Sequence, residues 1–532
     1  MSQVLPRHLA HILVFSTYLV LAFRLFRMVF LYAVNIFAWD QWGFNDATLF
    51  QKHSLWQVFR WQWGPHREGI GGVLSKLLEP SIRWNSRYED FGIATIILVA
   101  AVLALFLKKR LFGTIGYEDI IIPLLFLTPV QYENLIAAEG PTPCSLPLLL
   151  MIVYCISWTI DSHWWKYFCV LLVNFFLIYT GYGIFIGLVT PCLIIFDYYR
   201  NTRHLARNYH AASAVALALS LASLLSFFIG YKVGGVGVAR TCSLPQMKNA
   251  VNYFWFMDLM FATFVGAKAD RPGKLLVLAI IVGGIILLST LIALLFFVGR
   301  LFSEAIAPWK TSVVVNALLG YSLLFCLTAA FGRLCLGLGL AESSRYMTHL
   351  ILAFFGLYLG ALSMRSRNWR ATYVSALFAV AMLSSAGISS TDRVRMNEYA
   401  KGKRAWRECY LTRHNIEECN TKTQFQIIPW ADHSFIDDRR LQEKLDFLER
   451  NHLNLYSDPN SGEIRNLNRV TNEHDDNDAL SISGRHERED TSFFLEHYLR
   501  KGRTVCRAHL FARVQSLLSL ECARLEGYRH LH

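Results

Sequence analysis

The sequence predicts an all-α polytopic membrane protein with about eleven transmembrane helices and a small extracytoplasmic region at its C-terminus. Hydrophobic residues make up 54% of the 532 residues, and many of them form long uninterrupted runs. A hydrocarbon layer about 30 Å thick takes roughly 20 helical residues to cross, and peptide groups in lipid must bond within the helix itself. The runs that approach or reach this length are residues 91–107, 167–180, 211–230, 275–298, 312–330 and 371–388.

The distribution of basic residues supports this fold class. The chain has a net charge of +13, but much of the excess lies at the ends of apolar runs, in Lys108–Arg110, Arg200–Arg207 and Arg365–Arg370. Basic residues in these positions are typical of cytoplasmic anchors of transmembrane helices. We therefore expect membrane lipids rather than nucleic acid as partners, and a multi-pass location in the plasma (inner) membrane.

The first apolar run, about residues 12–36, continues well past the length of a signal-peptide core and has no small-residue cleavage site. We expect it to remain as the first transmembrane helix. With the N-terminus in the cytoplasm, this helix places Asp40 on the outer side. The second helix returns the chain to the inside, and a third, over about 118–136, carries Glu133 and Asn134 outward.

Segment 250–267 decides the orientation of the second half of the chain. If it crossed the bilayer, the basic cluster Arg365–Arg370 would lie outside, against the positive-inside rule. Its Trp, Tyr and Phe content suits an interfacial or re-entrant helix, so we expect it to stay on the outer face. The C-terminal region is then extracytoplasmic, in an oxidising space where Cys409 and Cys419 can form a disulfide.

The chain divides into a membrane part and a polar tail. Residues 1–390 hold the apolar runs and a long first outer loop, about 37–90. Residues 391–456 mix charged and aromatic side chains and are expected to form a small domain on the membrane surface. Residues 457–490 have the composition of a disordered linker, and residues 491–532 recover a helical pattern.

The first outer loop contains the first candidates for function. Asp40 directly follows the apolar run, so a rigid helix would hold its carboxylate at the membrane surface, where it could accept a proton as a general base. The loop also contains His66, Arg67 and Glu68 among several tryptophans. This mixture suits a carbohydrate or a lipid headgroup. The competing interpretation is an aromatic interfacial belt with solvated charges.

Two later outer loops add further candidates. One places Glu133 and Asn134 between prolines, and the other combines Arg333 and several glycines with Arg345 and Tyr346. Glycine lets the backbone approach a ligand closely, and an arginine can hold a phosphate through two N–H groups. The positive-inside rule does not require an arginine on the outer side, which favours a functional role for Arg345.

Arg24 and Arg27 lie one turn apart on one face of the first helix. Buried arginines need partners, and either a lipid phosphate or an acidic neighbour would serve. The alternative is that both side chains extend toward the membrane interface.

Several segments, in their order along the chain, resemble a group of poorly characterised bacterial multi-span proteins that are similar to GT-C-type, polyprenyl-phosphate-sugar-dependent glycosyltransferases. The segments are the carboxylate after the first helix, "GPHREG", "QYENLIAAEG", "YTGYGIFIGLVTP" and "GRLCLGLGLAESSRYMTHLILAFFGLYLGAL". The resemblance spans residues 30–450, and "SSRY" is its most distinctive part. Residues 65–68 depart from the commoner His-Asn-Glu-His-Arg form of the first-loop motif. No Asp-x-Asp pair follows the first helix, so no metal or other cofactor is carried over.

The resemblance implies an integral membrane glycosyltransferase of the cell envelope. Such an enzyme transfers a sugar from a polyprenyl-phosphate donor to an extracytoplasmic glycan or lipid acceptor, with inversion at the anomeric carbon. In this scheme Asp40 is the general base and Arg345 binds the lipid phosphate. The remaining candidates would bind the substrates, and they are His66, Arg67, Glu68, Glu133, Asn134, Arg333 and Tyr346.

Other functions remain open at the level of sequence. A transporter or flippase for lipid-linked saccharides would show inverted repeats and paired charges at mid-membrane, and we find no repeat. A polymerase of lipid-linked saccharides would have its longest outer loop late in the chain, whereas here it comes first. A non-catalytic assembly protein that docks partners on its outer domain is the third alternative.

Overall fold

The chain is almost entirely helical in the residues that the structure, a computed structural model, describes. These are residues 7–64, 66–137, 140–143, 145–201, 207–232, 249–267, 274–302, 309–386, 389–428 and 438–458. Eight of the described helices are long and apolar enough to cross a bilayer. They are α1 (Arg7–Tyr32), α5 (Ser86–Phe112), α10 (Ile186–Asn201), α11 (Arg207–Phe228), α15 (Lys274–Phe302), α16 (Trp309–Arg333), α17 (Met347–Leu362) and α18 (Arg367–Ala386). The helices α10 and α17 reach this length together with the short turns that directly precede them.

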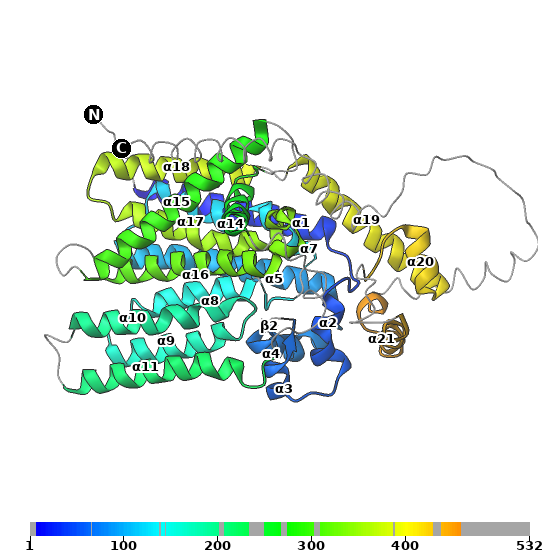
Figure 1. The fold of residues 1–532 in the computed structure, drawn as a ribbon. Helices are drawn as coiled ribbons and strands as arrows, with labels where there is room; N and C mark the ends of the chain where they lie inside the picture. The colour runs from blue at the N-terminus through cyan, green and yellow to red at the C-terminus, as the bar shows by residue number, and fades with distance from the viewer. Residues whose placement is uncertain are drawn as a thin grey trace, which may run out of the picture.

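These helices form one bundle, together with the shorter apolar helices α8 (Ser145–Ser157) and α9 (His163–Ile178) (Figure 1). The central helices α16 and α17 are the most buried, with 83% of the apolar stretch of each inside the protein. The outer helix α15 instead exposes apolar side chains such as Ile281, Ile285 and Leu288. A helix facing water would carry polar residues on that face. This distribution fits a multi-pass membrane protein whose outer helices face lipid.

The third expected helix, residues 118–136, is not continuous. It is divided into η3 (Tyr117–Ile120), α6 (Ile121–Phe126), η4 (Pro129–Gln131) and α7 (Glu133–Ile136). The break falls at Pro129, because proline lacks an N–H donor and disfavours helical geometry in the residue before it. The first helix likewise ends at Tyr32 instead of residue 36. In both places the chain leaves the helix early and turns, which positions Asp40 and Glu133.

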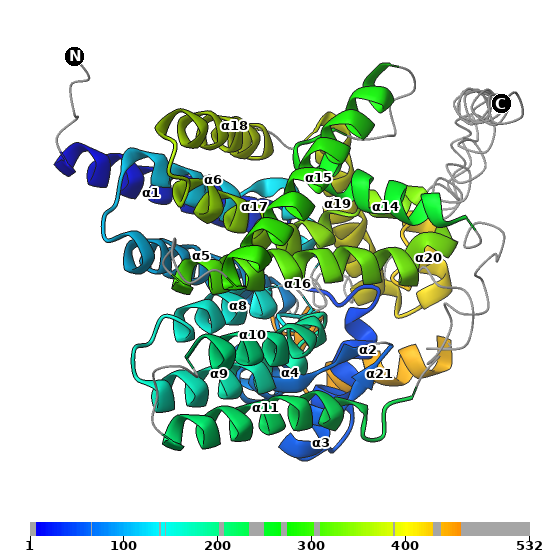
Figure 2. The same cartoon turned by 60° about the vertical axis from the view of Figure 1, so that its left-hand side comes forward.

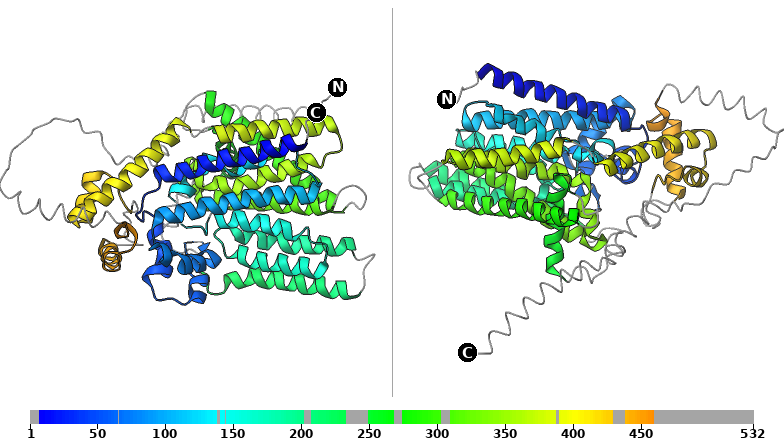
Figure 3. Two further views of the ribbon diagram at one scale, coloured as in Figure 1. Left: turned by 180° about the vertical axis from the view of Figure 1, so that it is seen from behind. Right: turned by 90° about the horizontal axis from the view of Figure 1, so that it is seen from above.

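The ambiguous segment 250–267 forms α14 (Ala250–Phe264), which lies across the bundle and not along it (Figures 1 and 3). It packs against α15 and against η7 (Leu338–Glu342), one of three short turns that follow α16. The other two turns are η6 (Leu334–Leu336) and η8 (Ser344–Tyr346). The orientation of α14 agrees with a helix that stays at one face of the bundle.

The opposite end of the bundle contains buried ion pairs. Lys108, expected as an interfacial anchor, is only 2% exposed, and its ammonium lies 2.6 Å from a carboxylate oxygen of Asp119. The hydroxyl of Tyr358 donates to the other oxygen of that carboxylate at 2.6 Å. A second buried pair joins Lys166 to Asp197. Both lysines therefore pair with carboxylates inside the protein, and for Lys108 this differs from the expected role as an interfacial anchor.

The first outer loop and the C-terminal region share one end of the bundle (Figure 1). The first loop folds into α2 (Gln41–Asn45), η1 (Asp46–Phe50), α3 (Leu55–Arg60), a hairpin of β1 (Gln62–Trp63) and β2 (His66–Arg67), α4 (Gly69–Leu78) and η2 (Glu79–Ile82). The C-terminal region folds into α19 (Ser390–Arg413), α20 (Ile416–Thr423), α21 (Asp438–Arg450) and η9 (Asn454–Tyr456). A further turn, η5 (Gly183–Phe185), precedes α10.

The two regions are held together by a second hydrophobic core. Phe37 and Trp42 from the first loop pack with Trp406 and Leu445 from the C-terminal region. Asn454 joins the two regions through hydrogen bonds, because its Oδ1 accepts from the backbone N–H of Phe37 at 3.1 Å and its Nδ2 donates to the carbonyl oxygen of Trp84 at 2.7 Å. The described residues of the expected domain at 391–456 thus share one hydrophobic core with the first loop, and the domain boundary itself stays a prediction.

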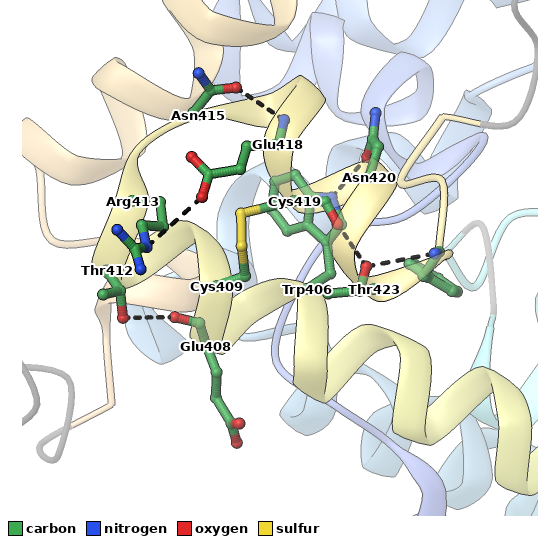
Figure 4. The surroundings of a disulfide bond; sticks show 11 residues. Trp406, Glu408, Cys409, Thr412, Arg413, Asn415, Glu418, Cys419, Asn420 and Thr423 are labelled. Carbon is green, nitrogen blue, oxygen red and sulfur yellow. Dashed lines mark hydrogen bonds and ion pairs between the residues drawn. A yellow bond between two sulfur atoms is a disulfide. The ribbon is translucent and has the colours of Figure 1, made fainter. Parts of the chain in front are cut away.

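The expected disulfide is present between Cys409, on α19, and Cys419, on α20, with the Cα atoms 5.6 Å apart (Figure 4). Cys335, in η6 after α16, is also disulfide-bonded. Disulfides persist in oxidising compartments, and the extracytoplasmic location of this end of the bundle stays a prediction. The expected linker and C-terminal helix fall outside the described residues from position 459 onward.

Candidate functional site

Three polar residues that are far apart in the sequence meet at the end of the bundle that carries the disulfide. Arg345 lies in η8, Glu133 begins α7, and Asp40 directly precedes α2. The guanidinium Nη1 of Arg345 is 3.9 Å from Oδ2 of Asp40, and its Nε is 3.7 Å from Oε2 of Glu133. The three side chains are 32%, 29% and 22% exposed, in the order Arg345, Asp40 and Glu133. A ligand in water could therefore reach this acidic and basic cluster, which we call the Arg345 cluster.

Glu133 fixes the backbone that carries Arg345. Its Oε2 accepts hydrogen bonds from the hydroxyl of Ser343 at 2.7 Å and from the backbone N–H of Arg345 at 3.0 Å. In return, the backbone N–H of Glu133 donates to Oγ of Ser344 at 2.9 Å. Hydrogen bonds to a charged acceptor are stronger than neutral ones. The Ser-Ser-Arg segment is thus held from both sides by a single residue of α7.

Asn134 supports the same segment from below. Its Nδ2 donates to the carbonyl oxygen of Arg345 at 2.9 Å and to Oγ1 of Thr348 at 2.8 Å. The hydroxyl of Thr348 donates in turn to Oε1 of Gln131 at 2.8 Å. Asn134 is only 5% exposed. Its position is that of a residue that orients Arg345, and these contacts do not bear on the substrate contact expected for it.

His66, in β2 of the first outer loop, is buried and lies in a row of rings. Its ring is 4.6 Å from that of Tyr182, which is 5.1 Å from that of His349. Nδ1 of His66 is 3.1 Å from the carbonyl oxygen of Gly181, so Nδ1 carries the proton and donates. Burial lowers the pKa of His66 to about 4, with the charge of Arg333 adding to this effect and the Gly181 carbonyl and Asp40 opposing it. His66 is therefore neutral at neutral pH.

Arg67 serves the fold of the first loop. Its Nε donates to the carbonyl oxygen of Phe227 and its Nη2 to that of Ile229, both at 2.9 Å, and its Nη1 donates to the carbonyl oxygen of Arg60. The guanidinium also lies over the ring of Tyr231, at 5.8 Å from the centroid. These contacts tie the β1–β2 hairpin to the end of α11. They give no support to the substrate-binding role expected for Arg67, which stays a prediction.

The remaining candidates lie around the same end. Glu68 is 3% exposed and lines a small cavity of about 10 Å³ together with Asn45 and Glu89. Tyr346, next to Arg345, is 2% exposed, and its ring is 5.9 Å from that of Phe325. Arg333, the last residue of α16, acts electrostatically on both His66 and Tyr346. The structure therefore gathers every predicted residue at one end of the bundle, and Arg345 lies within 4 Å of both Asp40 and Glu133.

A second group of buried charges was not predicted from the sequence. Glu79, Asp90 and Lys403 are 8%, 1% and 0% exposed. Burial raises the pKa of Glu79 to about 9, and the neighbouring carboxylates of Glu89 and Asp90 add to this effect. The group comes from the first loop, α5 and α19, and no local sequence pattern would have joined these positions. The carboxylates of Asp90 and Glu89 act electrostatically on Lys403, so the group links α5 to α19.

Within the described residues, no group of three or more His, Cys, Asp or Glu side chains has the arrangement of a metal site. Comparisons with protein-family models, with curated proteins and with solved structures found no match for this chain.

Proposed function

We propose that the protein is a membrane glycosyltransferase that uses a polyprenyl-phosphate-linked sugar and an extracytoplasmic glycan or lipid acceptor. The observation that carries this proposal is the contact of Arg345 with both Asp40 and Glu133, at 3.9 and 3.7 Å. A carboxylate and a guanidinium at the end of a lipid-facing bundle are the two groups that such a transfer needs. The side chains of Asp40 and Arg345 are partly exposed, and other residues fix the backbone that carries them.

In the proposed reaction, the carboxylate of Asp40 accepts the proton of the acceptor hydroxyl as its oxygen attacks the anomeric carbon of the sugar. The bond between that carbon and the phosphate oxygen breaks, and the polyprenyl phosphate leaves with the electron pair. Attack from the face opposite the phosphate inverts the anomeric configuration. Arg345 stabilises the charge that develops on the phosphate, an effect that preorganised cations supply in many enzymes.

The other residues of the site have supporting roles in this proposal. Glu133 and Asn134 position Arg345 through its backbone N–H and carbonyl groups. The buried ring of His66 and the partly buried ring of Tyr182 form an uncharged wall near the cluster. Aromatic and neutral polar side chains of this kind suit a sugar ring.

The experiment compares membranes that contain the wild-type chain with membranes that contain Asp40→Asn. Both are incubated with a panel of polyprenyl-phosphate-linked hexoses and pentoses and with a crude envelope fraction as acceptor. The readout is released polyprenyl phosphate, because this product is common to every donor sugar. We expect release by the wild type and a loss of at least 100-fold in Asp40→Asn, within the range of a general base.

Asp161→Asn is the matched control. Asp161 is 88% exposed and pairs with Lys310 at the opposite end of the bundle, so its loss should leave release unchanged. Wild-type release by Asp40→Asn would remove Asp40 from the mechanism. No release by the wild type with any donor of the panel would argue against the transferase itself.

A further inference from the structure

A cavity at the edge of the bundle combines arginines with an apolar floor. It has a volume of about 420 Å³ and lies between the end of α1, the α6–η4 connection, the end of α18 and the start of α19. Figure 2 shows α1, α6 and α18 side by side at this edge. The lining residues that matter here are Arg24, Arg27, Arg393, Leu25, Met28 and Leu127. We call this cavity the arginine groove.

Arg24 forms the inner wall of the groove. Its guanidinium donates to the carbonyl oxygen and hydroxyl of Ser385, on α18, and to the carbonyl oxygen of Leu127 at 3.2 Å. Its Nε is buried and has no hydrogen-bond partner in the described part of the chain. A buried N–H without an acceptor costs free energy. The side chain is thus fixed in place at the wall of the groove.

The charge in the groove is not balanced by the protein. Arg27 and Arg393 are exposed, and none of the three arginines forms an ion pair with a carboxylate among the described residues. Three guanidinium groups around one cavity repel each other unless an anion lies between them. Arginine suits a phosphate group in particular, because its planar N–H groups match two phosphate oxygens.

The position of the groove points to a lipid. Arg24 and Arg27 precede the end of α1 at Tyr32 by eight and five residues, which is about 12 and 8 Å along the helix axis. With Tyr32 at the membrane surface, Arg27 lies near the inner boundary of the headgroup region, which is about 5–8 Å thick on each side, and Arg24 lies about one turn deeper. The groove also lies at the end of the bundle that carries the disulfide, where the positive-inside rule does not account for arginines. Next to the groove, Phe23 and Phe30 of α1 are 71% and 60% exposed and would face acyl chains.

We propose that the arginine groove binds the phosphate headgroup of an anionic glycerophospholipid from the outer leaflet, with the acyl chains along the outer face of α1. We choose a glycerophospholipid because the groove opens on the lipid-facing side of the bundle, where such lipids are the abundant phosphate-bearing molecules. This site is separate from the proposed transferase reaction and does not depend on it. The bound lipid would join α1, α18 and α19 at the edge of the bundle.

The test uses the purified full-length protein in detergent and native mass spectrometry to measure bound lipid. The probes are a phosphatidylglycerol, a phosphatidylcholine with the same acyl chains, a polyprenyl phosphate and inorganic phosphate. The variant is Arg27→Gln/Arg393→Gln, which leaves the structural contacts of Arg24 intact. A surface arginine contributes about 1 kcal/mol to anionic lipid binding. We therefore expect the double variant to bind phosphatidylglycerol about 30-fold more weakly, which corresponds to about 2 kcal/mol.

The control is Arg413→Gln/Arg450→Gln, which removes the same charge from exposed ends of α19 and α21. Arg413 is 20 residues from Arg393 on one helix, which is about 30 Å. This variant should keep wild-type binding. Equal binding by both double variants would overturn the proposal, as would equal affinity for phosphatidylcholine. Displacement of phosphatidylglycerol by inorganic phosphate at the same concentration would indicate a site for a free anion. A preference for polyprenyl phosphate would indicate a site for a carrier lipid. Either result would also overturn the proposal.

Discussion

Replacement of Glu133 separates its hydrogen-bonding role from its charge. Both donors to this carboxylate, the hydroxyl of Ser343 and the backbone N–H of Arg345, use the same oxygen, Oε2. In Glu133→Gln the amide oxygen can accept both bonds, so the Ser-Ser-Arg segment keeps its geometry. In Glu133→Ala both donors lose their acceptor, and Ser343 is only 7% exposed.

The expected magnitudes follow from these contacts. A hydrogen bond to a charged group contributes about 1.5–3 kcal/mol. Because Glu133 is 22% exposed and water can replace part of the loss, we expect Glu133→Ala to lower the free energy of unfolding by about 3 kcal/mol. Glu133→Gln should lower it by less than about 1 kcal/mol.

The assay is unfolding in mixed detergent micelles with increasing sodium dodecyl sulfate, followed by tryptophan fluorescence. Glu118→Ala serves as control, because Glu118 is a 29% exposed carboxylate whose contact with Lys108 is 3.9 Å long, at the opposite end of the bundle. Glu118→Ala should lower the free energy of unfolding by at most about 1 kcal/mol, the usual contribution of a surface ion pair. Equal losses in Glu133→Ala and Glu133→Gln, or no loss in either, would refute the proposed role of Oε2.

Two further predictions concern the end of the bundle that carries the site. Lowering the pH from about 6.5 to about 4 should reduce the free energy of unfolding by up to about 3 kcal/mol through His66. The reason is that the imidazole of His66 binds a proton near pH 6.5 in the unfolded chain but only near pH 4 in the folded chain. Detergent unfolding of His66→Gln should lose this part of the pH dependence, and an unchanged profile would contradict the assignment. In Cys409→Ser/Cys419→Ser the free energy of unfolding should fall by about 3 kcal/mol, the value for a disulfide that closes a loop of this length. In intact cells that carry the wild-type protein, a membrane-impermeant thiol reagent should label Cys409 after mild reduction. Labelling only after lysis would place this end in the cytoplasm.

The sequence predicts most of the fold because lipid imposes strong rules on it. Long apolar runs that cross lipid must be helices. The rule is less strict for an interrupted run such as the one before Pro129, because a helix can end wherever other groups form hydrogen bonds with its backbone. The disulfide between Cys409 and Cys419 was predictable because the two residues are close in the sequence and lie in a polar segment.

The site was predictable in part. Asp40 and Arg345 could be predicted as site residues because each is a charged side chain at a position where an apolar or neutral residue would cost less free energy. The role of Arg67 was not accessible, because its partners are backbone carbonyl groups of α11, which any sequence would provide. The buried group around Asp90 and Lys403 was missed for a related reason, since only the tertiary fold brings α5 and α19 together.

The hydrogen bond between Phe37 and Asn454 joins residues that are 417 positions apart. At about 5–20 residues per second, a ribosome makes Asn454 some 20–80 s after Phe37. During that interval the turn next to Asp40 lacks the aromatic partners that later cover it. The end of the molecule that carries the Arg345 cluster is thus the last part to be completed, and a chain that terminates early would insert its helices without ever assembling it.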